Sequence, residues 1–190
     1  MLLVGPAGAL ASFWADPYPP YGGFMTPAEL LTDAFGRIVE GGRDVVDGLD
    51  DDQLAWRPGP DANPIAWLVW HLARIQDDHV ADVAGVEQVW TAQGFHDRFG
   101  LPFEPGDTGY GHTSAEVGQV RAGAGLLTAY LSAVHEQTIA YLATVTPDDL
   151  DRVVDNRWDP PVTLGVRLVS VVNDGDQHLG QAAYVRGLLG

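Results

Sequence analysis

The chain has 190 residues and contains neither cysteine nor lysine, so its ten basic residues are all arginine. Without cysteine there is no disulfide framework, no thiolate metal ligand and no cysteine nucleophile. Without lysine there is no Schiff-base residue and no P-loop lysine. A metal site in this chain must therefore use His, Asp or Glu, and thiol chemistry would need an added thiol.

Positive charge is scarce as well, because 26 acidic residues give a formal net charge of −16. Binding to nucleic acid requires a basic footprint, and attraction to an anionic membrane surface requires the same sign. No run of about 18 apolar residues indicates a membrane span, and the first basic residue, Arg37, comes too late for a signal peptide. We therefore expect a cytoplasmic protein that binds neither nucleic acid nor membrane.

The length suits a single domain, and a hydrophobic share of 46% is enough for a buried core. Residues 1–24 are predicted to be a flexible N-terminal extension. Met25 stands directly before a strong helix start, so the domain is expected to cover residues 25–190.

Apolar residues recur at helical spacing in four segments, and strand-like alternation is scarce. Capping boxes are predicted at Thr26 with Glu29 and at Thr113 with Glu116, and Asn63 is the predicted cap of the second helix. The expected helices cover 27–48, 64–84, 113–145 and 163–189. The long connection 85–113 would let the second and third helices run parallel. These features predict an all-α four-helix bundle with one long crossover.

Two helix faces carry residues suited to chemistry. Asp174 and His178 are one turn apart on an otherwise apolar stripe of the last helix, and His71 projects from a largely apolar face of the second. A buried carboxylate is costly unless it is paired or binds a metal, and ligands at i and i+4 can share one ion. From spacing alone, a three-ligand metal site and a plain buried His/Asp pair both remain open. The loop residues His96 and His112 are interpreted as solvated, with capping of a substrate cavity as the alternative.

The segments Asn63–Arg74 and Asp174–Gln181 resemble the second-helix and last-helix motifs of the DinB-like superfamily. The resemblance covers nearly all of the chain after the extension. It implies a four-helix bundle, often dimeric, that binds a divalent metal through His71, Asp174 and His178. An acidic residue at the position of Asp174 resembles the mycothiol-dependent maleylpyruvate isomerase branch. Zinc suits these donors, and nickel, manganese and iron accept them too.

The resemblance implies a thiol S-transferase or isomerase, in which a low-molecular-weight thiol such as mycothiol attacks a small electrophile. Arg74 is then a candidate to orient an anionic substrate group, and Asp78 is a candidate to accept a hydrogen bond from a metal ligand or to form a wall of the cavity. The alternatives are a non-catalytic, stress-associated metal-binding bundle and a structural bundle without metal.

Overall fold

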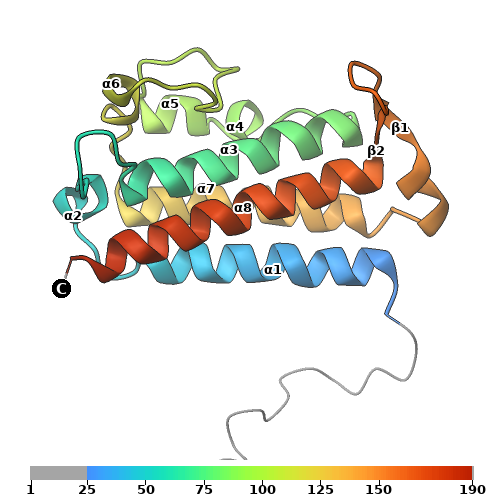
Figure 1. Cartoon of the computed structure of the whole chain (residues 1–190), viewed down its shortest axis with the longest axis horizontal. Helices are drawn as coiled ribbons and strands as arrows, with labels where there is room; N and C mark the ends of the chain where they lie inside the picture. Colours follow the sequence, from blue (N-terminus) through green and yellow to red (C-terminus); the bar gives the residue numbers. More distant parts are fainter. Residues whose placement is uncertain (1–24, 190) are drawn as a thin grey trace, which may run out of the picture.

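A computed structural model describes residues 25–189 of the chain; the predicted extension at 1–24 lies outside the described residues. Four long helices lie side by side (Figure 1): α1 (Pro27–Val46), α3 (Ile65–Ala84), α7 (Ala124–Leu142) and α8 (Leu164–Gly187). Helices α3 and α7 run in one direction while α1 and α8 run in the other, as the long connection predicts. The predicted all-α bundle is confirmed.

Local signals account for the helix starts. Both capping boxes form: Thr26 with Glu29 begins α1, and Thr113 with Glu116 begins the short helix α6 (Ser114–Val117). The prediction of one continuous helix from residue 113 is wrong, because the chain leaves helical geometry after Val117 and α7 begins only at Ala124. Glycines at 118 and 123 disfavour helix there. The predicted cap at Asn63 is also wrong: Pro64 occupies the cap position of α3, without a side-chain hydrogen bond.

Helix α3 forms the centre of the core. It packs against α8 and α7, while α1 packs mainly against α7 and α8 on the other side of the bundle. Most of its side chains are buried, including His71, Arg74, Gln76 and Asp77. Buried polar residues require hydrogen-bond partners, so the contacts of these four residues show which functional role α3 has in addition to its packing in the core.

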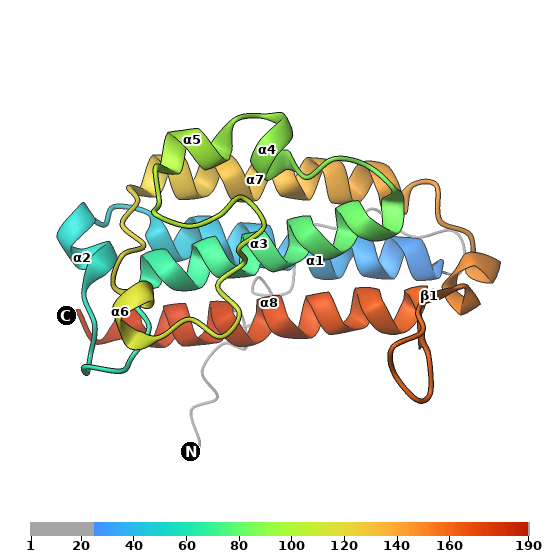
Figure 2. The same ribbon diagram turned by 90° about the horizontal axis from the view of Figure 1, so that it is seen from above.

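The long connection lies over α3 (Figure 2) and contains α4 (Val89–Ala92) and α5 (Phe95–Phe99). The rings of Trp90, Phe95 and Phe99 surround Tyr130 of α7, with centroids 5.1, 5.0 and 5.8 Å away. These aromatic residues therefore pack over the bundle. The carboxylate of Asp77 accepts hydrogen bonds from the backbone N–H groups of Val89 and Trp90, which attaches α4 to α3.

The remaining elements lie in the two linkers. The first contains α2 (Asp51–Ala55), and the second begins with a short 3-10 helix at Pro147–Asp151. A small antiparallel pair, β1 (Val153–Asp155) and β2 (Val162–Thr163), then leads into α8, whose first turn Thr163 caps. None of the described helices is long and apolar enough to cross a membrane.

Candidate metal centre

Helices α3 and α8 bring His71, Asp174 and His178 together. One ligand atom from each residue lies within 4.8 Å of the other two, which is close enough for all three to hold one ion. Among the described residues this is the only group of three or more His, Asp and Glu side chains with such spacing. The three residues predicted from spacing and resemblance therefore converge at one point of the bundle.

The ring of His71 is held in one orientation. Its Nδ1 lies 2.6 Å from the carbonyl oxygen of Thr108, so Nδ1–H donates and Nε2 carries the lone pair. Burial lowers the pKa of His71, while the hydrogen bond to Thr108 opposes that shift. The lowered pKa favours the neutral imidazole, which is the form that binds a metal.

The ring of His178 is oriented by a different partner. Its Nδ1 lies 3.2 Å from Oε1 of Gln181, so Nδ1 donates and Nε2 faces Oδ1 of Asp174 at 3.6 Å. Burial alone would lower the pKa of His178, but the hydrogen bond and charge of Asp174 outweigh burial and raise it. In both histidines a second partner fixes the ring, an arrangement typical of histidines that ligate metals.

Asp174 provides the test of whether the site fits a metal. Its Oδ2 is buried and has no hydrogen-bond partner among the described residues. A carboxylate oxygen in that state is unfavourable unless a cation or an ordered water satisfies it. Two imidazole nitrogens and one carboxylate oxygen fit zinc and other divalent transition metals, and three protein ligands leave positions for a substrate.

Tryptophan and histidine rings form one wall of the centre. The ring of Trp67 stacks on His71 with centroids 4.5 Å apart, and its edge contacts His178 at 6.0 Å. Its Nε1–H donates to Nδ1 of His112 at 3.2 Å, so Nε2 of His112 donates to the carboxylate of Asp107 at 3.0 Å. Hydrogen bonds through the side chains of Asp107 and His112, which lie on either side of Thr108, thus attach this segment to Trp67 of α3.

Close approach of this segment requires glycine at position 109, where φ is +89°. A Cβ there would lie 2.8 Å from Cζ3 of Trp70 and 2.9 Å from Nδ1 of His71. Only glycine combines this conformation with so little space. Gly109 therefore lets the carbonyl of Thr108 reach the His71 ring.

Arg74 is not brought to the group formed by His71, Asp174 and His178. Its guanidinium is fully buried and donates to the carbonyl oxygens of Asp107 and Pro105, to Gln88 and to the hydroxyl of Tyr130. It also lies 3.5 Å from the buried carboxylate of Asp77. In the structure Arg74 holds the segment that carries Thr108 and presents no surface to a substrate.

Asp78 lies further along α3, outside the group of three ligands. Its carboxylate accepts a hydrogen bond from Gln88 at 2.8 Å, and one oxygen lies 3.7 Å from Nδ1 of His79. Asp78 lines a pocket of about 320 Å³ between α3 and α8. Arg74, predicted to orient a substrate group, therefore supports the loop, and Asp78, predicted as an acceptor or a cavity wall, lines a pocket.

Sequence reasoning missed the partners that orient the ligands. Thr108 acts through its main-chain oxygen, which no side-chain pattern reports. His112 was interpreted as a solvated loop residue, but its side chain is buried between Trp67 and Asp107. The glycines at 109 and 111, both with positive φ, were the available sign that this loop turns tightly against the bundle.

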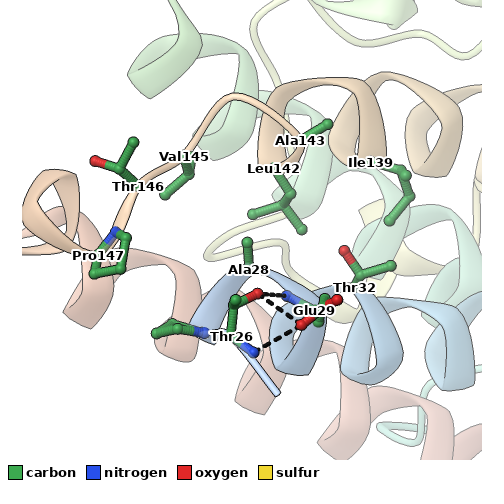
Figure 3. A pocket seen from close by; sticks show the side chains of 11 residues that line it. Thr26, Ala28, Glu29, Thr32, Ile139, Leu142, Ala143, Val145, Thr146 and Pro147 are labelled. Carbon is green, nitrogen blue, oxygen red and sulfur yellow. Dashed lines mark hydrogen bonds between the residues drawn. The ribbon is translucent and has the colours of Figure 1, made fainter. Parts of the chain in front are cut away.

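A different hollow lies between the start of α1 and the end of α7 (Figure 3), with a volume of about 470 Å³. Its one charged lining residue is Glu29, whose carboxylate accepts from the N–H and hydroxyl of Thr26 at 2.7 and 2.9 Å. These hydrogen bonds lower the pKa of Glu29. With its carboxylate occupied in the helix cap and the other lining residues largely apolar, the hollow offers no group for chemistry.

The fold and the site together define a class: a four-helix bundle with a His/Asp/His centre between its second and last long helices. Residues 30–190 match the mycothiol-S-transferase family, and the chain belongs to this family, a DinB-like one. A crystal structure of a conserved protein from Enterococcus faecalis is similar, with a TM-score of 0.80 and 30% sequence identity. The match covers 86% of this chain and 96% of that one. No curated protein matches.

Proposed function

We propose that the chain is a divalent-metal-dependent transferase that joins mycothiol, or a similar low-molecular-weight thiol, to a small electrophile. The observation that carries the proposal is the convergence of His71, Asp174 and His178, with Oδ2 of Asp174 buried and unpaired within the described part of the chain. Membership of the mycothiol-S-transferase family supports the choice of thiol. The absence of cysteine supports it as well, because the sulfur must come from a second molecule.

Nε2 of His71, a carboxylate oxygen of Asp174 and Nε2 of His178 would hold the ion. A bound divalent cation would supply one effect, stabilisation of a thiolate over the thiol at neutral pH. Zinc fits this donor set best, and nickel, manganese and iron accept the same donors. The reducing conditions under which a free thiol persists support a cytoplasmic location.

The chain's own residues orient the reactants. Thr108 and Gln181 fix the two imidazole rings, and the face of Trp67 shields one side of the centre from water. In the transfer, the thiol loses its proton to solvent and its sulfur forms a bond to an electrophilic carbon. The leaving group departs with the electrons of the bond that breaks. In an isomerisation, the same sulfur adds to the substrate and is later expelled.

Metal content and activity measured together test the proposal. Protein purified without an affinity tag should contain about one equivalent of metal. It should consume mycothiol with an electrophile such as an aryl halide, lose this activity on chelation and regain it with zinc. Asp174→Asn should strongly reduce both metal content and activity, whereas the exposed neighbour Asp176→Asn should retain them. Metal binding without turnover over a broad electrophile panel would indicate the non-catalytic metal-binding protein instead, and absence of bound metal would refute the site.

A further inference from the structure

The pocket that Asp78 lines lies between the C-terminal half of α3, the start of α8 and the turn after β1. Its volume of about 320 Å³ is in the lower part of the range for small-molecule sites. Polar side chains dominate its lining: Asp78, His79, Asp82, Gln88, Arg157 and Arg167. The metal centre does not include any of them.

The pocket is in line with the metal centre. Asp78 follows His71 by seven residues on α3, and Arg167 precedes Asp174 by seven residues on α8. Seven residues are close to two helical turns, so each pair shares a helix face, about 10 Å apart along the axis. At that spacing, one elongated molecule is long enough to reach from the metal centre to the pocket.

The polar groups of the pocket are held in place before any ligand binds. Arg74 donates to Oε1 of Gln88, which leaves the amide nitrogen of Gln88 to donate to Asp78 at 2.8 Å. Arg167 donates to Asp155 at 3.0 Å and to Nδ1 of His79 at 3.3 Å. Fixed donors and acceptors reduce the entropy that a polar ligand would otherwise lose on binding.

The charges of the lining select the chemistry of the ligand. Arg157 and Arg167 line the pocket together with Asp78 and Asp82, and Asp155 pairs with both arginines. A phosphate would meet the carboxylates and a cation would meet the guanidinium groups. Neutral hydroxyl groups, which both donate and accept, suit this alternation of donors and acceptors.

We propose that this pocket binds the hydroxyl-rich body of the thiol co-substrate while its sulfur lies at the metal centre. The inference rests on the proposed function. Mycothiol joins a cysteine derivative to a glucosamine–inositol pseudo-disaccharide, so its thiol is at one end and its hydroxyl groups are at the other. Contacts to the pseudo-disaccharide would hold the sulfur in position and distinguish this thiol from cysteine itself.

Calorimetric titration of zinc-loaded protein with two thiols tests the pocket. Mycothiol should bind more tightly than N-acetylcysteine, which has the thiol end alone. The double variant Asp78→Ala, Arg157→Ala should bind mycothiol about tenfold more weakly, the loss expected for a hydrogen bond to a charged group. Its affinities for N-acetylcysteine and zinc should not change. The matched control, Asp52→Ala with Arg121→Ala, removes the same charges from exposed positions outside the pocket.

Equal affinity of the wild type for both thiols, or unchanged mycothiol binding in the double variant, would overturn the pocket and leave the proposed function standing. A third titration separates the two proposals, using metal-free protein and the pseudo-disaccharide without its cysteinyl group. If wild-type protein binds the pseudo-disaccharide and the double variant does not, the result supports the pocket. Failure of the zinc-loaded protein to bind any thiol would refute the proposed function, but it would not affect that result. Absence of binding to the wild type would count against the pocket.

Discussion

The carbonyl oxygen of Thr108 lies 2.6 Å from Nδ1 of His71 and thereby leaves Nε2 as the ring nitrogen with the lone pair. The contact connects the long connection to the buried face of α3. It is held from two directions, by Arg74 through Asp107 and Pro105, and by Trp67 through His112. The geometry of the centre therefore depends on the connection as much as on the two helices that carry the ligands.

Replacement of Asp174 by Asn should remove the anionic ligand and lower the affinity for zinc by about 100-fold or more, since even the loss of an outer partner costs 10–100-fold. Competition with a chromophoric chelator measures the change. Asp176→Asn, an exposed position two residues away, makes the same change in net charge and should bind zinc normally. Wild-type affinity in Asp174→Asn would contradict the assignment.

A comparison of Gly109→Ala with Gly111→Ala should distinguish the effect of backbone strain on stability from the effect of a displaced loop on zinc affinity. Both positions have positive φ, so each alanine should cost about 1–2 kcal/mol of stability. Only at 109 would the new Cβ meet the rings of Trp70 and His71, since no described atom lies within 4 Å at 111. Zinc affinity should fall about tenfold or more in Gly109→Ala alone. Equal zinc affinities in the two variants would refute a role for Thr108 in orienting His71.

Arg74→Met should destabilise the fold by about 3–5 kcal/mol, because it leaves the buried carboxylate of Asp77 without its cation. Urea unfolding of metal-free protein measures the loss. Arg74→Lys should recover little of it, since an ammonium group cannot make the forked contacts to Gln88 and Asp107. Combination of Arg74→Met with Asp77→Asn should cost less than the two changes added separately. Strict additivity would mean that the two side chains do not interact.

The pairing of Asp155 with arginine predicts a pH dependence of stability. Hydrogen bonds from Arg157 hold the pKa of Asp155 well below its ordinary value. Because the folded pKa lies below the unfolded one, near 3.9, the stabilisation is complete at neutral pH and is lost as the pH falls below about 4. The difference in unfolding free energy between wild type and Asp155→Asn should therefore be constant from pH 8 to 6 and narrow in acid. A difference that stays constant down to pH 3 would contradict the pairing.

The long helices were predictable because their signals are local. Capping boxes at Thr26 and Thr113 and apolar spacing along α1 and α8 depend only on neighbouring residues. The break after Val117 was missed, and Asn63 was predicted as the cap that Pro64 occupies, because the glycines and the proline there compete with otherwise helical patterns. Periodicity also gave no sign of the small strand pair that leads into α8.

At the site, the convergence of His71, Asp174 and His178 was predictable because an i, i+4 pair and a motif place them on known helix faces. That they bind a metal stays a prediction. The positions of Arg74 and Asp78 were harder to predict, since both depend on where a long loop lies over α3. Arg74 is four residues from Asp78 on one helix, yet one contacts loop carbonyls and the other a pocket. Only the path of the connection distinguishes them.

Because the partner of His71 is a main-chain oxygen, the identity of the side chain at 108 matters little to the centre. Threonine there can be exchanged for many residues without loss of the contact, whereas insertion or deletion of one residue between Asp107 and Gly109 would displace it. Selection in related chains should therefore act on the length of this segment and on its glycine, and leave the residue type at 108 free to drift.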